Sequence, residues 1–240
     1  MNMNVMGSPG RIGSIAGTDT ELVPGTAEIR NKLMTATTLG LRLGAKYPTV
    51  KNDVEALVSR IQAQTEKANR VAGDRTRNQY QKHLFARDLA NELSAEIKRT
   101  QELLARTSKQ LIAEGEDLVE GTLGPRDNYA ALYSEIRSWI RENKTTPEGL
   151  QRISDAYKEN LSIAQAIYHS PHQLLNMEKA LHQTMRMKAA ELFEPKGFAM
   201  LNEGVDIGGV LKNYDRTNYD VHRSYYHPEM VAEAEASVVQ

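Results

Sequence analysis

Apolar residues recur at every third or fourth position through most of residues 26–193, and this period predicts helices rather than strands. Turn-forming residues such as Gly73 and Pro195 interrupt the period and separate one predicted helix from the next. The predicted helices begin near residues 26, 50, 75, 125, 147 and 171. The pattern therefore predicts an all-α protein.

The third predicted helix, residues 75–120, is the longest. Leu89, Leu93, Ile97 and Leu104 follow one stripe, but threonines interrupt the heptad, which favours bundle packing over a strict coiled coil. About 45 helical residues at 1.5 Å each span about 68 Å. A compact chain of this length would have a diameter of about 45 Å. We therefore expect an elongated bundle of about six helices with one very long helix.

Three predicted helix starts carry a proline. Pro125 and Pro147 are placed at the first helical position, where the missing N–H costs nothing. The third start is Ser170 followed by Pro171 and Gln173, which has the spacing of a capping box. On this interpretation the neighbouring histidines simply flank a helix boundary.

The two ends of the chain lack a helical period. Residues 1–25 are spaced by Gly, Ser and Pro, and we expect an extended N-terminal arm there. Residues 26–194 are expected to form the helical bundle. In residues 195–240 the period weakens and tyrosines gather, so we expect an irregular aromatic C-terminal tail that also extends as an arm.

Composition and charge narrow the possible roles. The chain has no cysteine, which excludes disulfides, thiolate metal sites and cysteine nucleophiles. The formal net charge of -1 gives no general attraction to nucleic acid or to an anionic membrane. No signal peptide and no transmembrane run of about 20 apolar residues is visible. We expect synthesis in the cytoplasm, followed by incorporation into a larger assembly.

Motifs that would indicate an enzyme are missing. The sequence contains no Walker-type loop, no HExxH, no GxSxG and no EF-hand loop. The best metal candidate is Glu178 with His182, one helical turn apart, with His169 or Glu191 as a third ligand. A structural role for His182 is the favoured interpretation. We therefore expect no catalytic residue, no cofactor and no metal.

The C-terminal tail carries the residues that we expect at a protein interface. Tyrosine suits an interface because it buries a large area and keeps a polar tip. The predicted interface residues are Tyr214, Tyr219, His222, Tyr225, Tyr226 and His227.

A basic segment offers a nucleic-acid alternative. Basic side chains around Tyr80 could contact a phosphate backbone. These side chains are Arg70, Arg75, Arg77, Lys82 and Arg87. Asp74 and Asp88 interrupt the segment, which favours an ordinary solvated helix face.

Together these features indicate a non-enzymatic structural subunit of a multi-subunit particle, with both arms making inter-subunit contacts. The expected partners are copies of the same chain and other protein subunits. A bacterial-virus virion or head–tail connector is the first expected context, and a secretion apparatus is the second. The alternatives are a nucleic-acid-associated packaging or core protein and, last, a helical-bundle metal enzyme.

Overall fold

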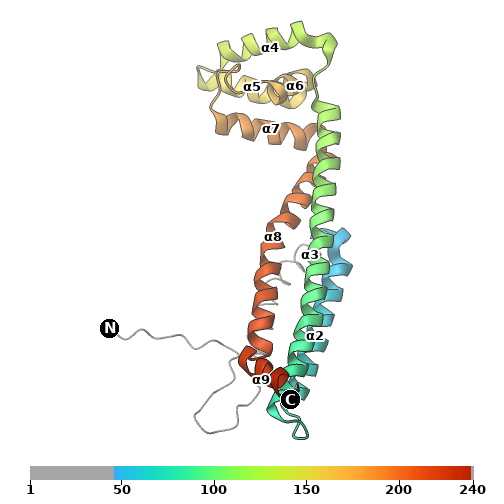
Figure 1. Ribbon diagram of the computed structural model, residues 1–240. Coiled ribbons are helices and arrows are strands. Elements are labelled where there is room, and N and C mark those ends of the chain that lie inside the picture. Colours follow the sequence, from blue (N-terminus) through green and yellow to red (C-terminus); the bar gives the residue numbers. More distant parts are fainter. Residues whose placement is uncertain (1–45, 239–240) are drawn as a thin grey trace, which may run out of the picture. The chain divides into compact units, whose positions relative to one another are not determined.

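The computed structural model describes residues 46–238, which form eight α-helices, two short 3-10 helices and no strand (Figure 1). The prediction of an all-α protein is confirmed. The predicted N-terminal arm and the predicted helix beginning near residue 26 lie outside the described residues. The α-helices are α2 (Lys51–Ala72), α3 (Gln79–Leu123), α4 (Ala130–Asn143), α5 (Pro147–Glu159), α6 (Leu161–His169), α7 (Lys179–Phe193), α8 (Pro195–Tyr225) and α9 (Pro228–Val238). The 3-10 helices are η1 (Pro48–Val50) and η2 (Asp127–Tyr129).

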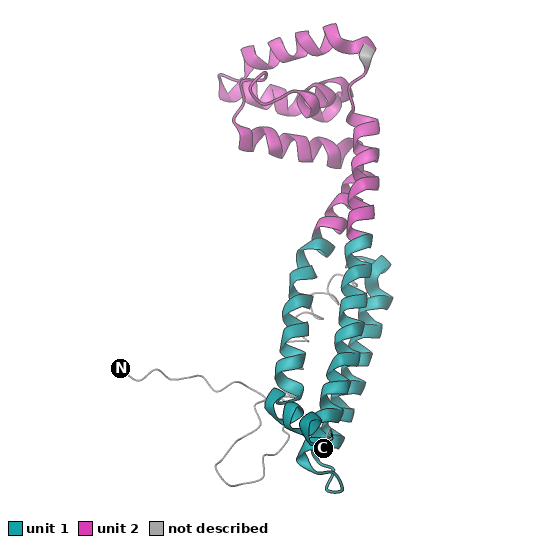
Figure 2. Ribbon diagram, in the orientation of Figure 1, with its two compact units in different colours: residues 1–107, 206–240 teal, residues 108–205 magenta. Residues whose placement is uncertain are grey.

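The chain divides into two compact units (Figure 2). Unit 1 comprises residues 1–107 and 206–240, and unit 2 comprises residues 108–205. Two helices contribute to both units, because α3 and α8 each continue through a boundary. The predicted very long helix is confirmed, since α3 has 45 residues.

The prediction of an irregular tail over residues 195–240 is wrong for the described part of that segment. Helix α8 runs for 31 residues from Pro195 to Tyr225, and α9 follows after a two-residue break. The buried side chains of α8 do repeat at three and four residues, but several of them are not aliphatic. The residues that follow this spacing are Ile207, Val210, Tyr214, Thr217, Val221 and Tyr225, and the polar side chains of Asp220 and Ser224 are buried beside them.

Two of the three predicted proline starts need correction. Pro147 begins α5 as predicted, and Thr146 caps this helix by accepting a hydrogen bond at its Oγ1 from the Gly149 backbone N–H at 3.1 Å. Pro125 does not begin a helix, because η2 comes first and α4 starts only at Ala130. Ser170 is the C-cap of α6 rather than an N-cap, and α7 begins at Lys179.

The turns between α6 and α7 replace the predicted helix start. Leu175 and Met177 point into the core of unit 2, and Asn176 has a positive φ of 49°. The backbone carbonyl of His172 accepts a hydrogen bond from the Met177 N–H at 2.9 Å. Burial of these two apolar side chains explains why residues 171–178 leave the helical path.

Each unit has its own apolar core. In unit 1, α2, α3 and α8 lie side by side (Figure 2), and residues such as Val54, Leu93 and Tyr214 are buried. In unit 2, α4 to α7 enclose a cluster that includes Ile140 and Ile167. None of the helices formed by residues 46–238 is both long and apolar enough to cross a bilayer.

Glycines permit a close contact between the parts of α3 and α8 that belong to unit 2. A Cβ added at Gly115 would lie 2.8 Å from the Gly197 carbonyl oxygen. A Cβ added at Gly204 would lie 2.8 Å from the Ser108 carbonyl oxygen. The Ser108 hydroxyl also donates a hydrogen bond to the Gly204 carbonyl at 2.7 Å. The two backbones therefore approach too closely for larger residues.

Candidate functional site

The three clustered histidines of unit 2 are held by backbone carbonyls. His182 is buried, and its Nε2 lies 2.9 Å from the Ile167 carbonyl oxygen. His172 places Nδ1 at 3.2 Å from the Met177 carbonyl oxygen, and His169 Nε2 contacts the carbonyl of Leu123. A carbonyl only accepts, so each of these ring nitrogens carries a proton and donates it. The histidines fasten the end of α6 and the turns after it.

This arrangement does not assemble the candidate metal ligands. Within residues 46–238 no group of three or more His, Asp or Glu side chains could hold a metal ion. Glu178 is the exposed N-cap of α7, and Glu191 is exposed near the other end of that helix. His182 is instead satisfied by the Ile167 carbonyl, which supports a structural role for this ring.

Unit 2 carries an apolar groove on its surface, with a volume of about 280 Å³, which we call the α7–α8 groove. Val205 and Met187 are its most exposed apolar side chains, with 62% and 51% of their surface accessible. The guanidinium of Arg186 lies over the Tyr168 ring at 4.5 Å and gives one wall a positive charge. The lining residues are Tyr168, Gln183, Arg186, Met187, Ala190, Phe198, Leu201, Asn202 and Val205.

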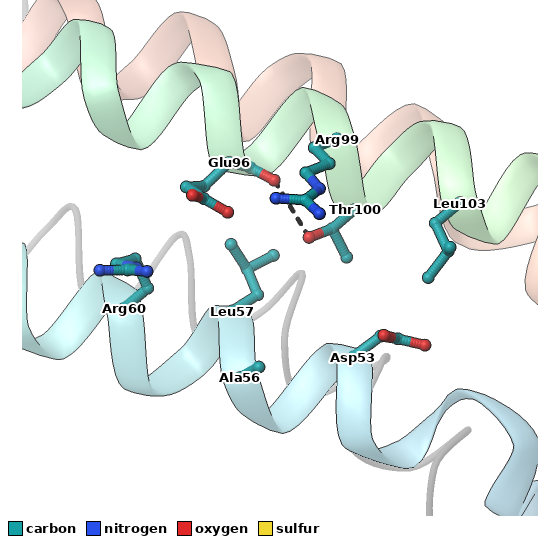
Figure 3. A pocket seen from close by; sticks show the side chains of 8 residues that line it. All are labelled: Asp53, Ala56, Leu57, Arg60, Glu96, Arg99, Thr100 and Leu103. Carbon is teal, nitrogen blue, oxygen red and sulfur yellow. Dashed lines mark hydrogen bonds between the residues drawn. The ribbon is translucent and has the colours of Figure 1, made fainter.

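Unit 1 carries a second groove between two of its helices, with a volume of about 260 Å³, which we call the α2–α3 groove (Figure 3). Leu57 and Leu103 give it an apolar floor, and charged side chains of both signs surround them. The lining residues are Asp53, Ala56, Leu57 and Arg60 from α2 and Glu96, Arg99, Thr100 and Leu103 from α3.

Two of the predicted interface tyrosines belong to the core of unit 1. Tyr214 is 2% exposed and Tyr225 is fully buried, so neither presents a surface to a partner. Burial raises the pKa of the Tyr214 hydroxyl to about 12. The Tyr225 hydroxyl lies 3.4 Å from the Thr65 hydroxyl. The interface prediction is corrected for these two residues, because the helical path of α8 turns them inward.

The other four predicted interface residues differ in exposure. Tyr219 is 63% exposed on α8. His222 and Tyr226 are half-buried and contact each other, with 3.3 Å between Nδ1 and the hydroxyl. His227 is half-buried, and its backbone N–H donates a hydrogen bond to His83. Only Tyr219 of the predicted set presents most of its side chain to solvent.

Three of the five basic side chains around Tyr80 form hydrogen bonds or ion pairs within unit 1. Arg77 pairs with Asp74 at 3.2 Å, and Lys82 donates to the Ala72 carbonyl at 3.0 Å. Arg87 pairs with Asp88 at 3.2 Å and also with Glu235 of α9. The remaining two residues of the set, Arg70 and Arg75, are exposed. These contacts weaken the nucleic-acid interpretation, since phosphates would have to displace carboxylates already in place.

The sequence analysis predicted neither groove. Apolar periodicity indicates which residues share a helix face, but not whether a neighbouring helix covers that face. Leu57 is 4% exposed and Leu103 is 40% exposed, although each lies on a helix with an apolar stripe.

Comparisons of the chain with known protein families, with curated protein sequences and with solved structures find no match.

Proposed function

We propose that the protein is a non-enzymatic structural subunit that assembles with copies of itself. The α7–α8 groove is the observation that carries this proposal. Its lining combines exposed aliphatic side chains with a partly exposed phenylalanine, Phe198. Covering such a surface is favourable by about 25 cal/mol for each Å² of apolar area removed from water. A groove lined by exposed apolar side chains is a surface that a helix of a partner can cover.

The groove fits an apolar helix face from a neighbouring copy. Phe198, Leu201 and Val205 recur at three and four residues on α8, so they form one ridge that a partner helix can follow. Arg186 lies at the wall of the groove beside Tyr168. A carboxylate on the partner helix, placed against this guanidinium, would fix the orientation of the contact.

The polar chemistry of unit 2 supports a structural role rather than a catalytic one. Each of the three histidines donates a hydrogen bond from one ring nitrogen to a backbone carbonyl. Helix α3 has 45 residues, and a helix of this length offers a long lateral surface for contacts with neighbouring subunits. A bacterial-virus virion or head–tail connector is the context that we propose first, and a secretion apparatus is the second.

The proposal is tested by light scattering on the full chain and on two substituted chains. Val205→Asp or Met187→Asp places a charge in the α7–α8 groove, and we expect the assembled mass to fall. The matched control is Ala199→Asp, which adds the same charge at an exposed position of α8 outside the groove. Equal masses for the wild type and both groove variants would contradict the proposed contact. A wild-type monomer that binds nucleic acid with steep salt dependence would favour the packaging alternative instead.

A further inference from the structure

We infer that the α2–α3 groove is a two-fold contact in which α2 of one copy lies antiparallel to α2 of a second copy. This inference rests on the proposed function, because it names one surface through which copies of the chain associate. It concerns unit 1 alone and uses no residue of the α7–α8 groove.

The charged side chains of this groove have no hydrogen-bond or ion-pair partner among the residues that the structure describes. Asp53, Arg60 and Arg99 are exposed, and Glu96 is half-buried. Within residues 46–238 none of these four side chains forms an ion pair or a side-chain hydrogen bond. Two guanidinium groups and two carboxylates therefore surround an apolar floor without neutralising one another.

The spacing of the charges on α2 makes the surface complementary to itself. Asp53 and Arg60 are seven residues apart, which is two helical turns or about 10.5 Å along the same face. Figure 3 shows them at opposite ends of the groove, with Ala56 and Leu57 between them. A two-fold axis that crosses α2 between Ala56 and Leu57 exchanges the two ends. Asp53 of each copy then faces Arg60 of the other.

The centre of the groove permits the close approach that such a contact requires. Ala56 is exposed and small, so two antiparallel α2 helices can meet there without a bulky side chain between them. Leu103 on α3 is 40% exposed beside this line, and a second α2 lying in the groove would cover it. An unrelated partner would need neither equal numbers of opposite charges nor their symmetric placement. A second copy supplies both.

Charge reversal provides a direct test with the full chain. In Arg60→Glu the two contacts become Glu opposite Asp, and in Asp53→Arg they become Arg opposite Arg. We expect each single variant to self-associate at least about tenfold more weakly than the wild type, because like charges meet twice per dimer. An equimolar mixture of the two variants restores both opposite-charge pairs, so we expect the mixed dimer to form with about the wild-type dissociation constant.

Matched controls separate this contact from a general charge effect. Lys212→Glu on α8 and Glu66→Arg on α2 make the same changes in charge at exposed positions outside the groove. We expect both to associate like the wild type in sedimentation velocity. Single variants that associate normally would overturn the inference. Folded single variants that associate weakly and gain nothing from mixing would also overturn it.

A cysteine substitution tests the same geometry without changing any charge. The natural chain has no cysteine, so Ala56→Cys introduces one thiol next to the proposed axis. A disulfide forms only when the two Cα atoms lie within about 7 Å. We expect mild oxidation to give a covalent dimer for Ala56→Cys and a monomer for Gln62→Cys, which lies on the opposite exposed side of α2.

These outcomes separate the two-fold contact from the proposed self-assembly. A wild-type assembly that forms no Ala56→Cys dimer removes the two-fold contact and leaves the proposed function in place. A wild type that stays monomeric contradicts the proposed self-assembly and the two-fold contact together.

Discussion

The imidazole of His83 accepts a hydrogen bond from the backbone N–H of His227, with 3.1 Å between Nδ1 and N. The contact joins α3 to the short break between α8 and α9, and the His83 ring is fully buried. Burial lowers the pKa of His83 from 6.5 to about 4, and the charge of His227 adds to this effect. A protonated Nδ1 could not accept this hydrogen bond.

Acid is therefore expected to destabilise unit 1. The folded-state pKa of His83 lies below its unfolded-state value, so the unfolded chain binds the proton first as the pH falls. The stability from the neutral ring is complete above about pH 6.5 and is lost between about pH 6.5 and pH 4, by up to about 3 kcal/mol. Urea unfolding across this range measures the loss. His83→Asn keeps an acceptor near the position of Nδ1 but does not titrate, and it should show a flatter pH dependence.

Two glycines of α8 should respond to alanine in opposite directions. At Gly204 an added Cβ would lie 2.7 Å from Ile112 Cγ1 and 2.8 Å from the Ser108 carbonyl oxygen, so Gly204→Ala should destabilise by about 1–3 kcal/mol. At Gly209 no described atom lies within 4 Å of the added Cβ. Gly209→Ala should therefore stabilise the helix by about 0.5–1 kcal/mol. Thermal unfolding of both variants checks the difference, and a gain in stability for Gly204→Ala would contradict the close backbone contact.

His182 should behave as a buried hydrogen-bond donor. His182→Ala removes the donor to the Ile167 carbonyl and leaves a cavity, so we expect a loss of about 2–4 kcal/mol in unfolding free energy. His182→Gln can place its amide nitrogen near the position of Nε2, and it should recover part of this loss. Stoichiometric zinc in the purified wild type that disappears in both variants would show that the ring is a metal ligand instead.

The beginning of the described chain is fastened to α8 by Asp206. Its carboxylate accepts hydrogen bonds from Lys46 Nζ and from the Tyr47 hydroxyl, both at 2.7 Å. These two hydrogen bonds, the one from Lys46 first, hold the pKa of the Asp206 carboxyl below its ordinary value. The resulting stability is present at neutral pH and is lost as the pH falls below the unfolded-state pKa of about 3.9.

Tyr47→Phe tests this contact because it removes one hydroxyl and keeps the ring. The Asp206 side chain is 41% exposed, so solvent screening limits the expected loss to about 1 kcal/mol at neutral pH. Urea unfolding at pH 7 measures it. In the Asp206→Asn background the same substitution should cost less, and an equal cost in both backgrounds would rule out coupling through this carboxylate.

The sequence alone predicted the helices where the buried residues are aliphatic and recur at every third or fourth position. Leu89, Leu93 and Ile97 are buried on α3, and their spacing alone predicted a very long helix. The period failed on α8, where glycines bring the backbones together and where Tyr214 and Thr217 occupy buried positions. Tyrosine and threonine at such positions look like surface residues until a neighbouring helix covers them.

The turns after α6 show a second limit. Ser170 and Pro171 have local signals of a helix start, yet the chain bends there because Leu175 and Met177 are buried against residues distant in sequence. The grooves show a third limit, since Val205 and Leu103 differ from buried residues of the same type only in what surrounds them. Exposure of this kind depends on tertiary packing, which local sequence patterns do not record.

The most direct test of self-assembly is the mass of the full wild-type chain in solution, measured by light scattering over a series of concentrations. One chain has a mass of 26.9 kDa. If the protein assembles with copies of itself, this measurement should show a discrete species of at least twice this mass that shifts toward the monomer on dilution. A mass of 26.9 kDa at every concentration would contradict it.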